Sequence, residues 1–595
     1  MAEDRLAAEI VTQLHEAERA RADWEDMWIR AYQLYRSVVE ELDEEDSDRA
    51  NLFIPRTWAQ VETIVPRVVA TMLARRPWVE VRGVEPGDEE AAYLNAWLID
   101  HQFERQTMFL TLLDLVREAV IAGTAIGHLS WRYEARRMRR RVWRPIVSET
   151  GVDLTRLLGA PMTPQEIEQE RIVWDEPYLY HDHLLDHYPS PEGKDVDEIP
   201  WIIRRSWVSL DDLVAANRAM EALGVGPVYQ RLGELEQTAP PEEDLAQEEI
   251  RSAIGMSGVV PIQGRRRTIE LLARWENDRL VVVANRTVTI RDAESVFWHG
   301  RKPFVRLQAY RIPHEYYGVG IPEVIQYLQE EVNARHNQRL DAATLALNPL
   351  AVISRGAGVR ARDLVMRPGG ILWVDALDDV NKLVQFIRGP EIPASAYQEE
   401  AALNQEMDAA TGASEFARGE FPEQRPTATE VGALVNAISS RVDLMVRVMA
   451  YTGLREVGRH FLWLNQQFMT QPKAVRILGA RGVEWRQIAP WEIAGEFDVL
   501  PAAANVDQIT NPLQQRKDAL EILEIAARLP QLQGRVDVPE LFRQILLTYP
   551  WLRDVDAVLL SPERAAQMQA ATGGSPLPVP SNAVPMPRAA GGGVA

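Results

Sequence analysis

The stretch that decides the fold is YGVGIPEVIQYLQEEVNARHNQRLDAATLALNP, Tyr317–Pro349. Pro322 predicts the start of a helix, because its fixed φ suits a first helical turn and its missing N–H is not needed there. We expect the helix to end at Leu347, since the residue before Pro349 disfavours helical geometry. At 1.5 Å per residue, such a helix spans about 39 Å.

The apolar positions of this helix form only a thin stripe. His336 interrupts the stripe, which consists of Ile325, Leu328, Val332, Leu340 and Leu347. The other faces carry charged and amide side chains. The pattern therefore predicts a helix that packs sideways against neighbours, not one enclosed in a core.

Two more helices follow this one. A capping box, Ser395-x-x-Gln398, begins a helix that ends near Gly412, and Thr427-x-x-Glu430 begins one that runs to Met469. The longer helix would span about 60 Å if straight, so we expect a bend near Gly453 or Gly458. Between the helices we expect short strands within 350–393 (350–354, 370–375 and 382–387), and then a loop, ASEFARGEFPEQRP, at 413–426.

The rest of the chain reads as mainly helical with one β-rich part. We expect helices over 1–46, 58–75 and 88–122, each carrying apolar residues at helical spacings. We expect strands over 128–133, 201–207, 268–275, 280–284, 287–290, 304–310, 475–478 and 496–500. The interpretation is an α+β fold, mainly α with β-rich patches, with a flexible insertion at 238–264, short helices within 509–560 and a disordered tail at 561–595.

Composition excludes several classes of protein. The chain has 595 residues, and Lys+Arg 65 against Asp+Glu 87 gives a net charge of −22, which disfavours a nucleic-acid coat or a membrane-surface binder. It has no cysteine, which excludes disulfides, thiolate metal sites and cysteine nucleophiles. The charged N-terminus is not expected to be a signal peptide, and no apolar run is long enough for a transmembrane helix.

One cluster resembles a metal site. His183 and His187 in YHDHLLDHY are four residues apart, which on a helix would place both imidazoles on one face. Pro189 and Pro191 follow directly, so a polar turn is the better interpretation. A metal-dependent hydrolase using His183 and His187 stays open as an alternative function, although the chain has no phosphate-binding loop, HExxH or GxSxG motif.

Two basic runs could contact nucleic acid. They are Arg136–Arg144 and Arg265–Arg267. In a chain of this acidity, such runs are more typical of solvated faces that balance neighbouring carboxylates.

Several segments together resemble the portal (head-to-tail connector) proteins of tailed bacteriophages. Tyr317–Pro349 is similar to the stem helix of that family, and Asn51–Pro77 to its early helix. Glu118–Trp131 resembles the family's helix-to-strand turn, and Asp186–Leu213 its turn, strand and helix start, although the Asp-Pro dipeptide is missing here. The pair Thr411-Gly412 and the segment Arg425–Glu430 resemble the borders of the tunnel loop. The likeness covers about residues 50–470.

The resemblance implies a domain layout and a role. The layout is a wing at 1–312, a first stem helix at 313–349, a clip at 350–393, a second stem helix at 394–412, a tunnel loop at 413–426, a long wing helix with closing strands at 427–508, and a crown at 509–560. The subunits would form a dodecameric ring, located at the capsid vertex of the virion and in the host cytoplasm during assembly. Double-stranded DNA would pass through without sequence specificity. Its partners would be the terminase motor, the major capsid and scaffolding proteins and the tail adaptor, with no enzymatic activity, metal, cofactor or membrane.

The resemblance also suggests functional residues. In the tunnel loop, Glu415, Phe416, Arg418, Glu420 and Phe421 would face DNA. In the clip, Arg355, Arg360, Arg362 and Arg367 would contact a neighbouring subunit or a motor or adaptor protein. The stem would use Arg335 and Arg339. A non-viral helical scaffold stays open as the other alternative.

Overall fold

A computed structural model describes residues 2–39, 49–144, 162–222, 226–236, 268–347, 350–353, 384–387, 394–412, 441–479 and 482–502. The chain divides into two compact units, 1–473 with 487–506, and 474–486 with 507–595. In the second unit the structure describes residues of one hairpin, formed by β14 (Lys473–Gly479) and β15 (Gly482–Ile488). The architecture below is that of the first unit, and its mixture of helices and strands confirms the α+β class.

The N-terminal region forms two helices, so the prediction of one helix over 1–46 was wrong. They are α1 (Ala2–Ala20) and α2 (Ala22–Arg36), and α2 ends at Ser37 in the left-handed region. The break falls at Arg21, whose buried guanidinium donates to the carbonyls of Leu185 (2.7 Å) and His187 (2.6 Å). A long-range anchor that the sequence does not reveal therefore separates the two helices.

The predicted helix over 88–122 is also two helices. They are α4 (Glu89–Arg105) and α5 (Met108–Ala122), separated by Gln106 and by Thr107, whose φ is 54°. Gln106 donates to the carbonyl of Pro177, which fixes the break against the neighbouring strand. The helix expected over 58–75 is present as α3 (Arg56–Met72), and it accommodates Pro66 in its interior.

A five-stranded antiparallel sheet packs against α1. Its order is β4 (His187–Pro189), β5 (Ile202–Ser209), β6 (Thr268–Trp275), β7 (Arg279–Ala284) and β8 (Val288–Glu294). Ile10 and Leu14 of α1 are buried against Leu272 and Val283 of the sheet. Helix α7 (Leu210–Ala222) follows β5, as the sequence predicts.

A three-stranded sheet contains two unusually long strands. Its order is β3 (Thr163–Asp182), β2 (Thr124–Arg144) and β9 (Phe304–Gln308). The sequence predicts only residues 128–133 of β2, because the outer part of this strand, residues 135–144, is rich in arginine and lacks an alternation of apolar and polar residues. This unit also has two short antiparallel pairs, β1 (Val79–Gly83) with β16 (Phe497–Pro501) and β10 (Tyr310–Arg311) with β11 (Gly318–Val319).

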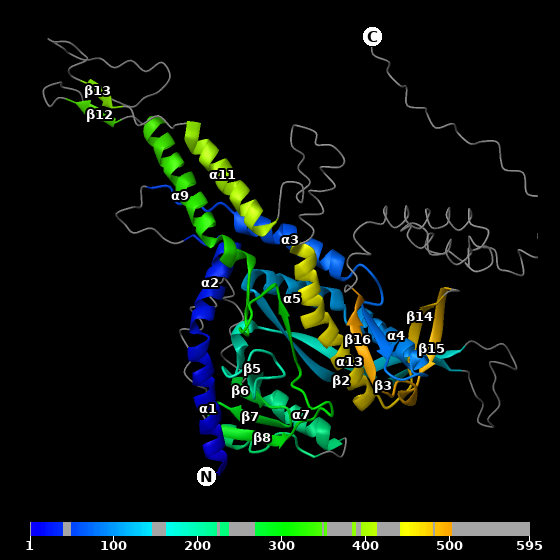
Figure 1. Ribbon diagram of the computed structural model, residues 1–595. Helices are drawn as coiled ribbons and strands as arrows, with labels where there is room; N and C mark the ends of the chain where they lie inside the picture. The colour runs from blue at the N-terminus through cyan, green and yellow to red at the C-terminus, as the bar shows by residue number, and fades with distance from the viewer. Residues whose placement is uncertain are drawn as a thin grey trace, which may run out of the picture. The chain divides into compact units, whose positions relative to one another are not determined.

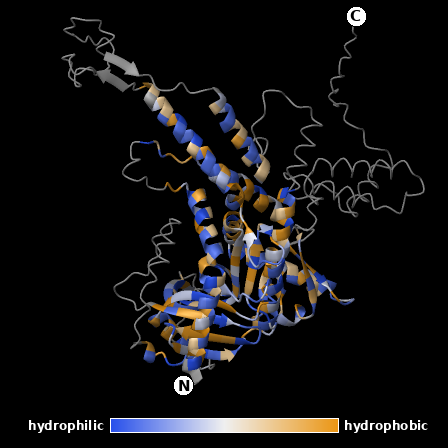
Figure 2. Cartoon of the chain, turned by 60° about the vertical axis from the view of Figure 1, so that its left-hand side comes forward, coloured by the Kyte–Doolittle hydropathy of each residue, from blue (hydrophilic) through white to orange (hydrophobic). Residues whose placement is uncertain are grey.

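The main core connects the helices to these sheets. Helices α2, α3 and α5 pack around the root of α9 (Ile321–Leu347), and helix 441–449 continues through a π-helical turn, Ala450–Leu454, into α13 (Arg455–Phe468). Gly453 lies within this irregular turn, where a bend was expected. Figure 2 shows mainly hydrophobic colours in the strands of the five-stranded sheet and mainly hydrophilic colours along α9.

Three glycines fix the place where α9 leaves the core. A Cβ on Gly320 would lie 2.1 Å from the carbonyl oxygen of Ile121, and one on Gly123 would lie 2.0 Å from that of Gly318. Gly123 also has φ +81°, which favours glycine. The backbones of the α5–β2 turn and of the segment before α9 therefore touch, which gives a physical reason for the glycines in both stretches.

Several expected elements lie outside the described residues. They are the insertion at 238–264, the strand at 370–375, the start of the third helix, the helices within 509–560 and the tail at 561–595. Of the helices that the structure describes, none is both long and apolar enough to cross a bilayer.

Candidate functional site: the α9–α11 pair and its surroundings

Two helices extend away from the core side by side. Helix α9 and helix α11 (Ala394–Thr411) pack together, and the antiparallel strands β12 (Leu350–Ile353) and β13 (Val384–Ile387) lie on the connection between them (Figure 1). We call these two helices the α9–α11 pair. The predicted bounds of both helices and the predicted strands at 350–354 and 382–387 are confirmed, and the structure adds that these two strands pair with each other.

Charged groups lie between the two helices. Arg339 of α9 contacts the carboxylate of Glu400, and its guanidinium stacks 4.9 Å from the ring centroid of Tyr397. Arg335 lies 3.9 Å from Glu399. The two arginines singled out from the sequence thus reach across the pair within one subunit.

A ladder of polar side chains on α9 holds the extended segment before α3. Asn333 Oδ1 accepts from the backbone N–H of Ile54 (2.9 Å), and Asn337 accepts from the N–H of Leu52 (3.0 Å) and donates to its carbonyl (3.1 Å). At the ends of the ladder, Gln329 accepts from Thr57 N–H (2.9 Å) and Asp341 from Ala50 N–H (2.7 Å). We call Gln329, Asn333, Asn337 and Asp341 the α9 ladder.

The ladder works because two periodicities match. Four residues of an α-helix rise about 6 Å, and two residues of extended chain rise about 6.6 Å. Asn333, Asn337 and Asp341 of α9, at i, i+4 and i+8, can therefore bond the alternate residues 54, 52 and 50 of this segment. Gln329 lies outside this match, because its partner Thr57 belongs to the first turn of α3. The spacing of these amides is visible in the sequence, but the segment they bind is not.

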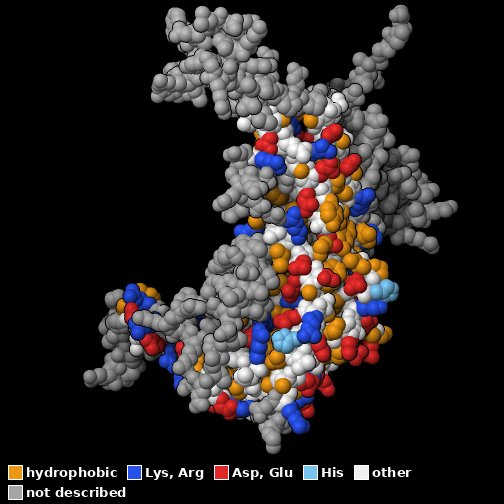
Figure 3. Space-filling model, turned by 90° about the vertical axis from the view of Figure 1, so that its left-hand side faces the viewer, with side chains coloured by type: hydrophobic (Ala, Val, Ile, Leu, Met, Phe, Trp, Pro, Cys, Tyr) orange, Lys and Arg blue, Asp and Glu red, His pale blue; other side chains and the backbone are white. Residues whose placement is uncertain are grey.

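The outer surface of α9 and α11 exposes large apolar side chains among charged ones. Tyr327 is 75% exposed, Leu347 80% and Tyr397 56%. Leu347 belongs to the apolar stripe predicted for α9, and that stripe is fully buried only in the first half of the helix, at Ile325 and Val332. Figure 3 shows one face of the molecule as a mosaic of acidic, basic and hydrophobic side chains.

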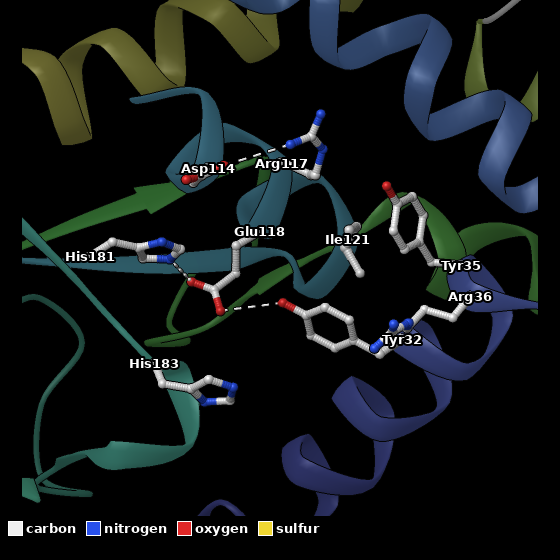
Figure 4. Close-up of a pocket in the computed structure, with 9 residues that line it drawn as sticks. All are labelled: Tyr32, Tyr35, Arg36, Asp114, Arg117, Glu118, Ile121, His181 and His183. Carbon is white, nitrogen blue, oxygen red and sulfur yellow. Dashed lines mark hydrogen bonds and ion pairs between the residues drawn. The ribbon is translucent and has the colours of Figure 1, made fainter. Parts of the chain in front are cut away.

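A cavity of about 520 Å³ lies between α2, α5 and the end of β3 (Figure 4). Glu118, which is buried, accepts from Tyr32 (3.3 Å) and pairs with His181 (2.6 Å). Burial lowers the pKa of His181, but the hydrogen bond and charge of Glu118 outweigh it and leave that pKa raised. The contacts of Glu118 therefore join α2, α5 and β3, while Arg117 and Asp114 pair with each other within α5 (3.7 Å).

The histidine cluster does not form a metal site. The segment is the end of β3, a short 3-10 turn at Leu184–Asp186 and β4, so the expected turn is confirmed. Nε2 of His187 lies 2.9 Å from the hydroxyl of Tyr316, and burial lowers the pKa of His187 to about 3. Asp182 is bound by Arg204 through two bonds (2.6 and 2.9 Å). Among the described residues no group of three or more potential ligands could hold a metal ion, so nothing here supports the hydrolase alternative.

The other sequence-predicted residues lie outside the described part of the chain. They are the loop residues Glu415, Phe416, Arg418, Glu420 and Phe421, the arginines Arg355, Arg360, Arg362 and Arg367, and the basic run Arg265–Arg267. The other basic run lies in β2, where Arg139 pairs with Glu168 (2.8 Å) and Arg141 with Glu166 (3.2 Å), so the interpretation of a balanced face holds for these two arginines.

The sequence likeness to phage portal proteins implies a pair of long stem helices attached to an α+β body. The α9–α11 pair, which leaves the core next to Gly123 and Gly320, has this arrangement. A family model described as phage SU10 portal protein matches residues 6–252 and 272–506, which is most of the chain. The chain therefore belongs to the phage SU10 portal protein family. No match was found among curated proteins. The protein is thus a phage portal protein, a structural component of the capsid vertex that serves in DNA packaging.

Proposed function

We propose that the protein assembles as a closed dodecameric ring whose central channel conducts double-stranded DNA. The observation that carries the proposal is the α9–α11 pair. Its two helices are joined by charged contacts to each other and by the α9 ladder to the segment before α3, yet their outer surfaces expose Tyr327 and Tyr397. Such surfaces are covered when identical subunits pack side by side around an axis.

The proposal assigns a part to each segment. Residues 1–312 and 427–508 form the wing, 313–349 and 394–412 the stem with Arg335 and Arg339, 350–393 the clip, and 509–560 the crown. The terminase would dock on the clip during packaging in the host cytoplasm, and the tail adaptor later. Capsid and scaffolding proteins would surround the ring.

Native mass spectrometry of the purified protein tests the ring. We expect a closed cyclic oligomer, with a dodecamer as the main species. A protein that stays monomeric or dimeric at micromolar concentration with its helices formed contradicts the proposal and favours a helical scaffold instead.

The four clip arginines Arg355, Arg360, Arg362 and Arg367 are proposed to contact the motor or a neighbouring subunit. Their simultaneous replacement by glutamate should abolish DNA packaging without loss of solubility. Normal packaging by that variant excludes this role.

The loop at 413–426 is proposed to point at the DNA. Its alternating charges, from Glu415, Arg418 and Glu420, would give weak sliding contacts with phosphates, and Phe416 and Phe421 would also face the DNA. Deletion of 414–423 should leave the ring intact and reduce DNA retention or translocation. Unchanged retention and rate would identify the loop as a simple connector.

A further inference from the structure

The outer part of the β2–β3 hairpin is a two-stranded ribbon with no third strand. We define the outer ribbon as residues 135–143 of β2 and 164–172 of β3. Strand β9 pairs with β2 only over Thr124–His128, so within the described part of the chain the strands of the outer ribbon pair only with each other. An isolated two-stranded ribbon is marginally stable in water, so a ribbon this long calls for a covering surface.

The two faces of the outer ribbon differ in charge. On one face Arg137, Arg139 and Arg141 lie opposite Glu170, Glu168 and Glu166, in register. Two of these positions form ion pairs, at 2.8 and 3.2 Å. We call this the paired face; its charges cancel within the hairpin.

The opposite face is cationic and apolar. Because side chains alternate along a strand, it carries every second residue of each strand. These residues are Arg136, Met138, Arg140 and Val142 from β2, and Arg171, Gln169, Ile167 and Gln165 from β3. We call this the open face, and it contains no carboxylate.

The charges of the open face are only partly balanced. Arg136 pairs with Glu134 at the base of the ribbon (2.5 Å). Among the residues that the structure describes, Arg140 and Arg171 form no ion pair. Met138 is 45% exposed between these arginines.

This composition suits a protein partner better than DNA. Arginine and methionine are enriched at protein interfaces, whereas aliphatic side chains gain nothing from a phosphate backbone. The partner must offer carboxylates beside apolar side chains. The chain itself, with its net charge of −22, has such a surface where β1 meets α4, with exposed Val84 and Tyr93 beside Glu85 and Glu89.

We propose that the open face of the outer ribbon is an interface by which one subunit holds a second copy of this chain, on an acidic and partly apolar surface. The inference rests on the proposed ring, because a head-to-tail ring joins two different patches of the same molecule. The paired face is not expected to take part in this contact, because its charges are already balanced within the hairpin.

Charge reversal tests this interface. The variant Arg140→Glu/Arg171→Glu should reduce the fraction of closed rings in native mass spectrometry by about tenfold or more, because like charges would then face each other. The matched control is Arg139→Glu/Glu168→Arg, which exchanges one ion pair on the paired face and should assemble as the wild type does. Circular dichroism of both variants checks that the strands still form.

A cross-link identifies the partner. Benzoylphenylalanine placed at position 138, in mixed rings of isotopically heavy and light chains, should give heavy–light cross-linked peptides. Cross-links only within one chain, or only to DNA or a capsid protein in the virion, overturn the inference. If the wild type forms rings and the Arg140→Glu/Arg171→Glu variant forms them equally well, the ribbon interface is excluded while the proposed ring stands. If the wild type itself is monomeric, both the interface and the proposed function are contradicted.

Discussion

At Gly320 a single methyl group would meet a backbone oxygen that has no room to move. A Cβ there would lie 2.1 Å from the carbonyl oxygen of Ile121, at the crossing that also involves Gly123 and Gly318. We expect Gly320→Ala to lower the free energy of unfolding by about 4 kcal/mol or more, because the crossing must open. Urea titration measures this. The control is Gly233→Ala, whose Cβ would meet nothing within 4 Å and should change stability little; equal effects of the two would contradict the argument.

Buried neutral histidines make the fold sensitive to acid. Burial lowers the pKa of His128 and His460 well below the ordinary value, and that of His187 to about 3. Below about pH 6.5 the unfolded chain binds protons at these positions and the folded chain does not, so stability falls as pH falls.

Each such histidine should lower the free energy of unfolding by about 1.4 kcal/mol for every pH unit below about pH 6.5. We expect His460→Phe to make the decline of the unfolding free energy shallower by about this slope, as measured by urea titrations between about pH 7 and about pH 5. His181 has a raised pKa, so its contribution is present below about pH 6.5 and is lost as pH rises through the folded pKa. A variant with the slope of the wild type would show that His460 is protonated in the folded state.

At the scale of elements, the α9 ladder is what attaches the long helix to the segment before α3. The variant Asn333→Ala/Asn337→Ala removes the bonds to Ile54 and Leu52, each worth about 1 kcal/mol net. We expect hydrogen exchange at these two amides to become about tenfold faster or more, because they become solvated.

A matched control for the ladder is Gln338→Ala, which removes an exposed amide from the same helix. Its exchange rates at Leu52 and Ile54 should equal those of the wild type. If the double variant behaves like this control, the segment is held by packing and not by the ladder.

Local signals predicted some elements well and others not at all. The helix at 321–347 and the one ending at Thr411 have proline, glycine and capping signals at their ends, and both are confirmed. The breaks at Arg21 and Thr107 were missed because they depend on partners more than 70 residues away, such as the carbonyl of Pro177. Strand β3 was missed because glutamates occupy every second position from 166 to 170 of its outer half, a pattern that has meaning only opposite the arginines of β2.

In the candidate site, too, some features are visible in the sequence and others depend on the tertiary fold. The amides of α9 and its two arginines are visible in the sequence, since their spacing is helical. Their partners, the segment at 50–57 and Glu399 and Glu400 of α11, are set by the tertiary fold. Family resemblance supplied the order of segments, while the contacts that hold them came only from the structure.

At the scale of the whole molecule, the net charge of the protein determines how strongly it binds DNA. A subunit of charge −22 repels the phosphate backbone at long range. A conduit benefits from this, because each neutralised phosphate adds affinity that opposes translocation.

We therefore expect the purified protein to bind a short DNA duplex only weakly at physiological ionic strength, with a Kd above about 10 µM and no dependence on sequence. Fluorescence anisotropy measures this, and lowering the salt concentration should strengthen binding only slightly. Tight binding with a steep salt dependence would show that basic surfaces face the DNA. The variant Arg140→Glu/Arg171→Glu then locates the contact: if it abolishes the tight binding, the outer ribbon touches DNA, and if it does not, the basic segments elsewhere in the chain are responsible.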